Sequence, residues 1–292
     1  IFVGTVDLTG TRTTILQMVA DELQLDPKEI TITVGDTDTA PFADLSGGSR
    51  ITYTMSAAAH QASQDVLSQL RERAAEKLKV SIDDVEYKQK RFWAKNDPQN
   101  EVSLTDLARE SVAWGSGPII GKGSTTRMQP AHSYAAHVAD VEIDPDTGKA
   151  TILRYTCFQD VGKAINPQQV EGQIQGGAVQ GIGWALNEEY IFDNGELKNA
   201  SLLDYRCPVA LDLPMIETVL TEVPASEGPY GLRGVGEVPI VPPGAALANA
   251  IYRATGKRLY ELPMNPERVF WAMHGNGANG TNGSGTKKSD GS

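Results

Sequence analysis

Apolar residues recur along the chain with two different periods, which together predict a mixture of helices and strands. Spacings of three and four residues predict helices, whereas alternation and short apolar runs predict strands. The predicted helices are 15–23, 56–80, 166–182, 245–255 and one starting at Asn265-Pro266, and the predicted strands are 1–6, 30–34, 134–143, 150–158 and 216–223. The turn formers of 144–148 join two of these strands into a hairpin. We therefore expect a mixed α/β (α+β) fold.

The distribution of these elements indicates two lobes, which we place at residues 1–120 and 121–274. Residues 275–292 are almost all Gly, Asn, Thr and Ser, a composition typical of a flexible tail. The chain starts at Ile1 inside a strand-like run rather than at a Met. We therefore expect it to be a fragment or a processed subunit of a longer protein.

Charge and cysteine content exclude several classes of protein. The 292 residues carry 26 basic and 37 acidic side chains, a net charge of −11, which has the wrong sign for a nucleic-acid binder. Two cysteines, Cys157 and Cys207, cannot ligate an iron–sulfur cluster alone, and we expect them to be core thiols in a reducing compartment. No run of 18 apolar residues predicts a membrane span.

Three glycine-rich stretches are candidates for chemistry, and each has a simpler alternative. Residues 46–50 (SGGSR) precede a predicted helix and suit a phosphate, but they also fit a plain loop. Residues 171–177 (EGQIQGG) lie within a predicted helix, where close packing explains glycines equally well. Residues 231–237 (GLRGVGE) end in Glu237, which is either a general base beside an apolar run or a solvated loop residue. The four histidines show no metal-ligand spacing.

The glycine-rich stretches belong to a longer series of motifs that occur in a fixed order along the chain. In the C-terminal half these motifs are the VEIDPDTG hairpin, Asp160-Val-Gly with Ile165-Asn-Pro, the GQIQGG run, Asp204-Tyr205, and GVGE followed by Ala-Ala-Leu-Ala-Asn. The N-terminal half adds GTVDLTGTRT, GDTD and GGSR. In this order the motifs resemble the C-terminal half of the molybdopterin-binding large subunit of the molybdenum hydroxylases, the xanthine dehydrogenase and aldehyde oxidoreductase family. The family's large subunits extend well beyond this chain.

The resemblance implies roles for individual residues. Glu237 matches the active-site glutamate, a buried base that takes a proton from a molybdenum-bound hydroxyl. Gln173 matches a hydrogen-bond partner of the pterin or of a molybdenum oxo group, and Gly47, Gly48 and Ser49 would contact the pyrophosphate or nucleotide end of the cofactor. The remaining implied cofactor contacts are Arg50, Thr9, Gly10, Thr11 and Gly236.

Two positions depart from the family's pattern. Leu8-Thr9-Gly10-Thr11 stands where many members have Gly-Gln-Gly, so a contact there must come from Thr or from backbone N–H groups. Arg233 stands where Lys is common, which keeps the charge.

The resemblance also implies cofactors and partners. It predicts a molybdenum enzyme active only in a complex, with molybdopterin in its cytosine dinucleotide form and no protein ligand to the metal. A second molybdopterin-binding chain or N-terminal half, a [2Fe–2S] subunit and a flavoprotein carrying FAD are the expected partners, in the cytoplasm. Water would supply oxygen to an aldehyde, N-heteroaromatic, purine or carbon monoxide. A catalytically silent assembly subunit and a non-redox nucleotide-binding module remain alternatives.

Overall fold

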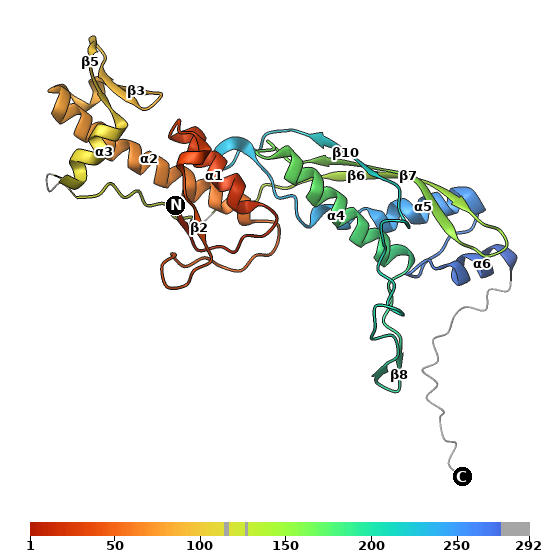
Figure 1. The fold of residues 1–292 in the computed structure, drawn as a ribbon. Helices are drawn as coiled ribbons and strands as arrows, with labels where there is room; N and C mark the ends of the chain where they lie inside the picture. Colours follow the sequence, from red (N-terminus) through yellow and green to blue (C-terminus); the bar gives the residue numbers. More distant parts are fainter. Residues whose placement is uncertain (114–116, 126–127, 276–292) are drawn as a thin grey trace. The chain divides into compact units, whose positions relative to one another are not determined.

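The computed structural model describes residues 1–113, 117–125 and 128–275 (Figure 1). The chain forms two units, each made of separate stretches of sequence. One comprises Ile1–Tyr134, Gln159–Gln173 and Leu220–Val238, and the other comprises Ala135–Phe158, Ile174–Val219 and Pro239–Ser292. The units therefore do not follow the predicted division at residue 120, because the chain after the hairpin returns to the first unit. Residues 276–292 of the predicted tail lie outside the described residues.

Helices and strands alternate irregularly along the described chain. The helices are α1 (Thr11–Glu22), α2 (Ile51–Leu78), α3 (Leu104–Ala113), α4 (Pro167–Leu186), α5 (Pro243–Thr255) and α6 (Pro266–His274). The strands are β1 (Phe2–Val3), β2 (Thr33–Val34), β3 (Val85–Lys88), β4 (Arg91–Ala94), β5 (Asp97–Ser103), β6 (Ala135–Ile143), β7 (Ala150–Asp160), β8 (Phe192–Asp193), β9 (Glu196–Leu197) and β10 (Ile216–Thr221). This mixture confirms the expected fold class.

In the first unit, α1 packs against α2, beside a two-stranded parallel pair of β1 and β2. Ile15 and Val19, one helical turn apart on α1, are buried together with Val3 and Ile32. The strands predicted over 1–6 and 30–34 are shorter than expected, because only two residues of each enter the ladder.

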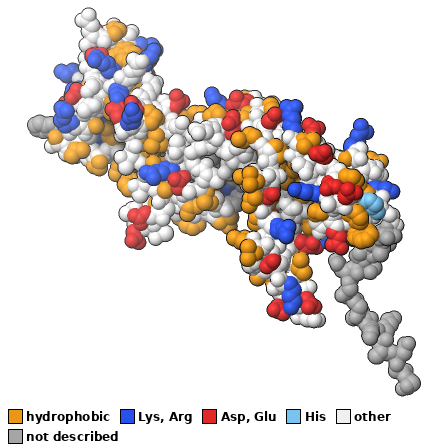
Figure 2. Space-filling model, turned by 45° about the vertical axis from the view of Figure 1, so that its right-hand side comes forward, with side chains coloured by type: hydrophobic (Ala, Val, Ile, Leu, Met, Phe, Trp, Pro, Cys, Tyr) orange, Lys and Arg blue, Asp and Glu red, His pale blue; other side chains and the backbone are white. Residues whose placement is uncertain are grey.

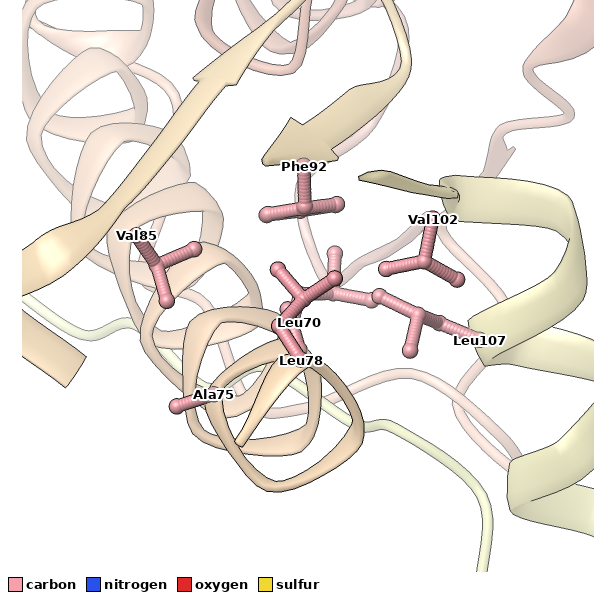
Figure 3. Packing of buried hydrophobic residues seen from close by; sticks show 8 residues of the cluster. Leu70, Ala75, Leu78, Val85, Phe92, Val102 and Leu107 are labelled. Atoms are coloured by element: carbon pink, nitrogen blue, oxygen red, sulfur yellow. The ribbon is translucent and has the colours of Figure 1, made fainter. Parts of the chain in front are cut away.

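The C-terminal half of α2 supports an antiparallel sheet that the sequence pattern did not predict. The strand order is β3-β4-β5, and the buried face of this sheet meets α2 (Figure 3). Phe92 is fully buried at the centre of this core, and its ring stacks on Tyr87 with the centroids 4.4 Å apart. Leu70 and Leu78 of α2 complete the contact.

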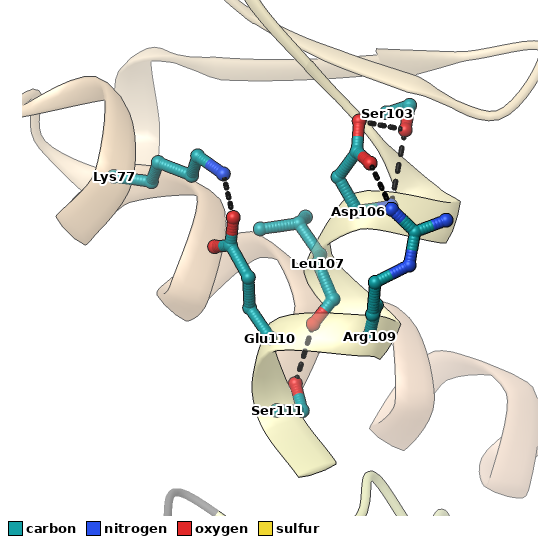
Figure 4. Close-up of polar contacts among 7 residues, drawn as sticks. All are labelled: Lys77, Ser103, Asp106, Leu107, Arg109, Glu110 and Ser111. Atoms are coloured by element: carbon teal, nitrogen blue, oxygen red, sulfur yellow. Dashed lines mark hydrogen bonds and ion pairs between the residues drawn. The ribbon is translucent and has the colours of Figure 1, made fainter. Parts of the chain in front are cut away.

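Helix α3 closes the same core and is held at both ends of its polar face (Figure 4). Ser103 Oγ accepts a hydrogen bond from the Asp106 backbone N–H at 3.1 Å, which caps the helix start. Lys77 of α2 pairs with Glu110, and Leu107 points into the core. The helix therefore joins α2 through apolar packing and an ion pair.

The second unit is built on a three-stranded sheet with the order β10-β7-β6. The predicted hairpin of β6 and β7 is confirmed: the Gly148 N–H donates to the Asp144 carbonyl at 2.8 Å within its turn. Helix α5 packs against β6 and ends at Gly256, and Asn265 caps α6 by accepting from the Arg268 N–H at 2.9 Å, both as predicted.

Three glycines of α4 have a packing reason within the second unit. A Cβ on Gly177 would lie 2.9 Å from Pro239, one on Gly181 would lie 2.6 Å from Pro243, and one on Gly183 would lie 2.7 Å from Pro208. No atom lies within 4 Å of the Cβ positions of Gly172 and Gly176. Within the stretch 171–177 the packing alternative is therefore supported for Gly177 alone, and beyond it for Gly181 and Gly183.

The surface carries charges of both signs (Figure 2), and the two cysteines differ in burial. On the face shown in Figure 2, acidic and basic side chains are interspersed. Cys157 is buried, and burial raises the pKa of its thiol to about 12, whereas Cys207 is exposed, so the expected core position is wrong for Cys207. Among the described residues, no helix combines the length and hydropathy required to span a membrane.

Replacing the central aromatic ring of the first unit tests its core. We expect Phe92→Ala to lower the free energy of unfolding by about 3–5 kcal/mol, because it leaves a cavity between the sheet and α2. Phe42→Ala is the matched control, since this side chain is 94% exposed, and it should change stability by less than about 0.5 kcal/mol. Urea unfolding monitored by fluorescence measures both, and equal losses would contradict the proposed core.

His137 of β6 is a partly buried imidazole that makes the stability of the protein depend on pH. Its Nδ1 lies 3.0 Å from the Tyr155 hydroxyl, and burial lowers the pKa of the imidazole from 6.5 to about 4. Between these values the unfolded chain binds more protons than the folded one, so stability decreases as the pH falls from about 6.5 to about 4.

We expect His137→Phe to remove this part of the pH dependence of urea unfolding. The exposed His132 provides the control, because His132→Gln should leave the dependence as in the unmodified protein. A dependence that persists in His137→Phe would assign it to another group.

Candidate functional site

A cleft of about 270 Å³ lies entirely within the first unit. Four segments that are far apart in the sequence line it: 8–14, 46–52, 161–173 and 232–237. One cavity is thus lined by residues of 46–50 and 231–237 and by Gln173 from the stretch 171–177.

Three helices begin at this cleft. Thr11 is the first residue of α1, Ile51 and Thr52 begin α2, and Gln169 lies in the first turn of α4. None of the three helices carries an acidic residue in its first turn. At the start of α1, however, the Asp7 carboxylate accepts a hydrogen bond from the Arg12 N–H at 3.1 Å. The partial positive charges at the starts of α2 and α4 are therefore the ones that favour an anion.

Residues 44–50 form a loop that is closed by its own charges. The Arg50 guanidinium pairs with the Asp44 carboxylate at 2.7 Å and donates to the Leu45 carbonyl at 2.8 Å. The hydrogen bond from Arg50 is the main cause of the lowered pKa of Asp44. Arg50 borders the cleft, but its fork is engaged by the loop itself.

The stretch 231–237 is anchored at its start by Tyr230. The Tyr230 hydroxyl donates to Glu22 Oε1 at 2.8 Å, and His60 and Gln64 contact the same carboxylate at 2.6 and 2.7 Å. Burial alone would raise the pKa of Glu22, but the hydrogen bonds from these three side chains hold it below its ordinary value. The carboxylate therefore stays charged and fixes the loop start to α1.

An ion pair fixes the middle of the same stretch. Arg233 Nε lies 3.1 Å from Asp160 Oδ2, with both side chains about one-eighth exposed, and Arg233 also donates to the Val223 and His132 carbonyls. Asp160 in turn accepts from the Gly162 N–H at 3.0 Å. Because these groups accept the hydrogen bonds of the guanidinium, Arg233 mainly stabilises the loop at the cleft wall.

The end of this stretch meets the loop that precedes α2. The Glu237 backbone N–H donates to Ser49 Oγ at 2.7 Å. A Cβ on Gly234 would lie 2.5 Å from the Ser49 carbonyl oxygen, a distance that real Cβ atoms do not show. Gly236 leaves room for both the Ser49 hydroxyl and the Gln173 carboxamide, which lie 3.5 and 3.6 Å from its Cβ position.

Most of the predicted site residues meet at the cleft. Glu237 and Gln173 line it together with Thr9, Thr11, Gly47, Ser49, Arg50 and Gly236. Gly10 and Gly48 belong to the same loops but are not part of the lining. Within this chain the expected burial of Glu237 is not reached: its side chain is exposed, and its loop is held through the backbone N–H at Ser49.

Sequence reasoning missed Gln169. Its carboxamide lies against Gly10, where a Cβ would approach within 2.1 Å, and its Oε1 is 3.5 Å from Thr14 Oγ1. A carboxamide is therefore present at the N-terminal loop, although that loop itself contains none. The i, i+4 spacing of Gln169 and Gln173 on one face of α4 is the signal that could have found it.

Removing the guanidinium at the cleft wall should be costly. We expect Arg233→Met to lower the free energy of unfolding by about 3 kcal/mol, because it leaves the largely buried Asp160 unpaired. Arg154→Met is the matched control, since Arg154 pairs with Glu217 at the surface with 62% and 46% of the side chains exposed, and it should cost less than about 1 kcal/mol. Thermal unfolding compares the two variants, and equal small losses would show that Asp160 does not hold the loop.

Comparison with known proteins gives one consistent result. A family model described as molybdopterin cofactor-binding domain matches residues 1–214. The chain is 34% identical over 276 residues to the 6-hydroxypseudooxynicotine dehydrogenase complex subunit gamma of Paenarthrobacter nicotinovorans, covering 91% of this chain and 35% of that protein. It is 33% identical to the putative xanthine dehydrogenase molybdenum-binding subunit of Escherichia coli, with coverages of 91% and 36%.

A solved structure agrees with these relatives. The reconstituted CO dehydrogenase from Oligotropha carboxidovorans superimposes with a TM-score of 0.82 at 30% identity, covering 92% of this chain and 34% of that one. The chain thus spans about a third of the length of the relatives it matches. The chain belongs to the molybdopterin cofactor-binding domain family of the molybdenum hydroxylase large subunits.

Proposed function

We propose that this chain forms the cofactor-binding wall of a molybdenum hydroxylase and supplies the general base of its reaction, with an aldehyde or an N-heteroaromatic compound as substrate. The observation that carries the proposal is the meeting of Ser49, Gln173 and Glu237, from three distant segments, at one cleft. Two of the relatives are named for xanthine and for 6-hydroxypseudooxynicotine, which supports the heteroaromatic class.

The side chains present fit a phosphate-bearing pterin. The cleft offers mostly hydrogen-bond donors and neutral acceptors. They come from the starts of α2 and α4, the hydroxyls of Thr9, Thr11 and Ser49, and the carboxamides of Gln169 and Gln173. The glycine at position 236 leaves the space beside Gln173 open. In this proposal the metal has no ligand from this chain, and its coordination is assigned to the pterin.

When bound, the molybdenum–pterin group supplies the oxidation that replaces a substrate C–H bond by C–OH, with water as the oxygen source and with two electrons and two protons released. Glu237 takes one of these protons at its carboxylate. Gln173 would present both a donor and an acceptor to the cofactor, and the Ser49 hydroxyl together with the start of α2 would bind its pyrophosphate. The cytosine dinucleotide form of the cofactor is part of this proposal.

The proposal extends to the partners. Two unpaired cysteines, one of them buried, cannot form a [2Fe–2S] cluster within this chain. We therefore assign electron transfer to a [2Fe–2S] subunit and a flavoprotein, beside a second molybdopterin-binding chain or N-terminal half. One relative is itself named as the subunit of a complex. Free thiols favour a reducing compartment, and we propose the cytoplasm.

Glu237→Gln in the native complex tests the proposed base. Because the amide keeps the size of the side chain but cannot take a proton, we expect turnover to fall at least about 100-fold, with molybdenum and pterin contents unchanged. Glu227→Gln is the matched control, since Glu227 is exposed in the same loop region and lies outside the cleft lining. Steady-state turnover with aldehydes and N-heteroaromatics gives the readout, and an unchanged rate in Glu237→Gln would refute the proposed role.

A further inference from the structure

The contact between Ser49 and Glu237 sets the position of the proposed base. Within the described part of the chain, the Glu237 carboxylate has no hydrogen bond or ion pair, and its backbone N–H donates to Ser49 Oγ at 2.7 Å. The direction of the side chain is therefore governed by where its main chain is held.

The backbone of Ser49 points to a role that glycine could not fill. Ser49 has a φ of 58°, a left-handed conformation that a residue with a Cβ adopts at a cost, and its neighbour Gly48 has a φ of 68°. A glycine would relieve this strain at position 49, but it would lack the hydroxyl oxygen that receives the Glu237 N–H. Serine at position 49 thus has an unfavourable backbone conformation but provides the hydroxyl that accepts the Glu237 N–H.

Close packing of the two backbones fixes the position of Ser49 relative to Glu237. The Cβ position of Gly234 is 2.5 Å from the Ser49 carbonyl oxygen and 2.9 Å from the Ser49 Cβ. The two loops therefore interlock over 46–50 and 234–237, and a shift of one moves the other. The half-buried Ser49 lies at the centre of this contact.

We propose that Ser49 is a positioning residue for Glu237 and links it to the cofactor loop, an inference that rests on the proposed function. A hydroxyl has two acceptor lone pairs and one hydrogen. Ser49 Oγ can accept the Glu237 N–H and at the same time donate its own hydrogen to an acceptor atom in the cleft. Occupation of the cleft and placement of the base are then coupled through one side chain.

Ser49→Gly tests this link, because it removes the hydroxyl and tolerates the left-handed backbone. In the native complex we expect amide hydrogen exchange in the peptide covering 231–237 to become about five- to tenfold faster, the effect of one lost hydrogen bond. We expect kcat to fall about tenfold or more with little change in KM, and the pH profile of kcat to shift. Lys79→Gly is the matched control, since Lys79 has the same φ of 58°, is exposed and ends α2 away from the cleft.

The outcomes separate this inference from the proposed function. Faster exchange at 231–237 together with a lower kcat and unchanged molybdenum content supports the positioning role. Unchanged exchange overturns it, including the case in which molybdenum is lost, because Ser49 would then act through the cofactor alone. Hydrogen exchange does not depend on turnover, so an active Glu237→Gln variant would refute the proposed base without altering this readout.

Discussion

The structure of the site depends on the close approach of two loops that are about 185 residues apart. Gly234 permits this approach because a Cβ there would lie 2.5 Å from the Ser49 carbonyl oxygen, and the Glu237 N–H closes the contact at Ser49 Oγ. The start of α2 and the end of the stretch 231–237 thereby become two walls of one cleft.

Charge secures the same arrangement from outside the cleft. Asp160 pairs with Arg233, and Glu22 accepts a hydrogen bond from Tyr230. The loop is thus fixed at its middle and its start by two carboxylates that are not part of the cleft lining. The cleft itself is lined by the starts of α2 and α4, by neutral hydrogen-bonding side chains and by Arg50, Lys163 and Arg233, with Glu237 as its acidic residue. This lining is the basis for the proposal that an anion binds beside the proposed base.

Local signals explain which elements could be predicted from the sequence. Helices α4, α5 and α6 carry their own boundaries in Asn166-Pro167, Gly256 and Asn265-Pro266, and the β6–β7 turn carries Gly148. The sheet of β3, β4 and β5 lacked such a signal, because its stability comes from the contact of Phe92 with α2, which is a tertiary interaction.

In the site, too, some features could be predicted from the sequence and others could not. Its glycine-rich stretches were visible as motifs, and their resemblance to a family placed Gln173, Ser49 and Glu237 together. The Gln169 contact with Gly10 and the exposure of Glu237 could not be predicted, since both depend on how separate segments meet in space.

We infer that the loops 46–50 and 234–237 form the molybdopterin site. An experimental structure of the native complex with its cofactor is the decisive measurement. We expect density for the pterin and its pyrophosphate in the cleft bounded by Ser49, Gln173 and Gly236, with the Glu237 N–H still bonded to Ser49. A cofactor bound elsewhere on the chain, with this cleft empty, would contradict it.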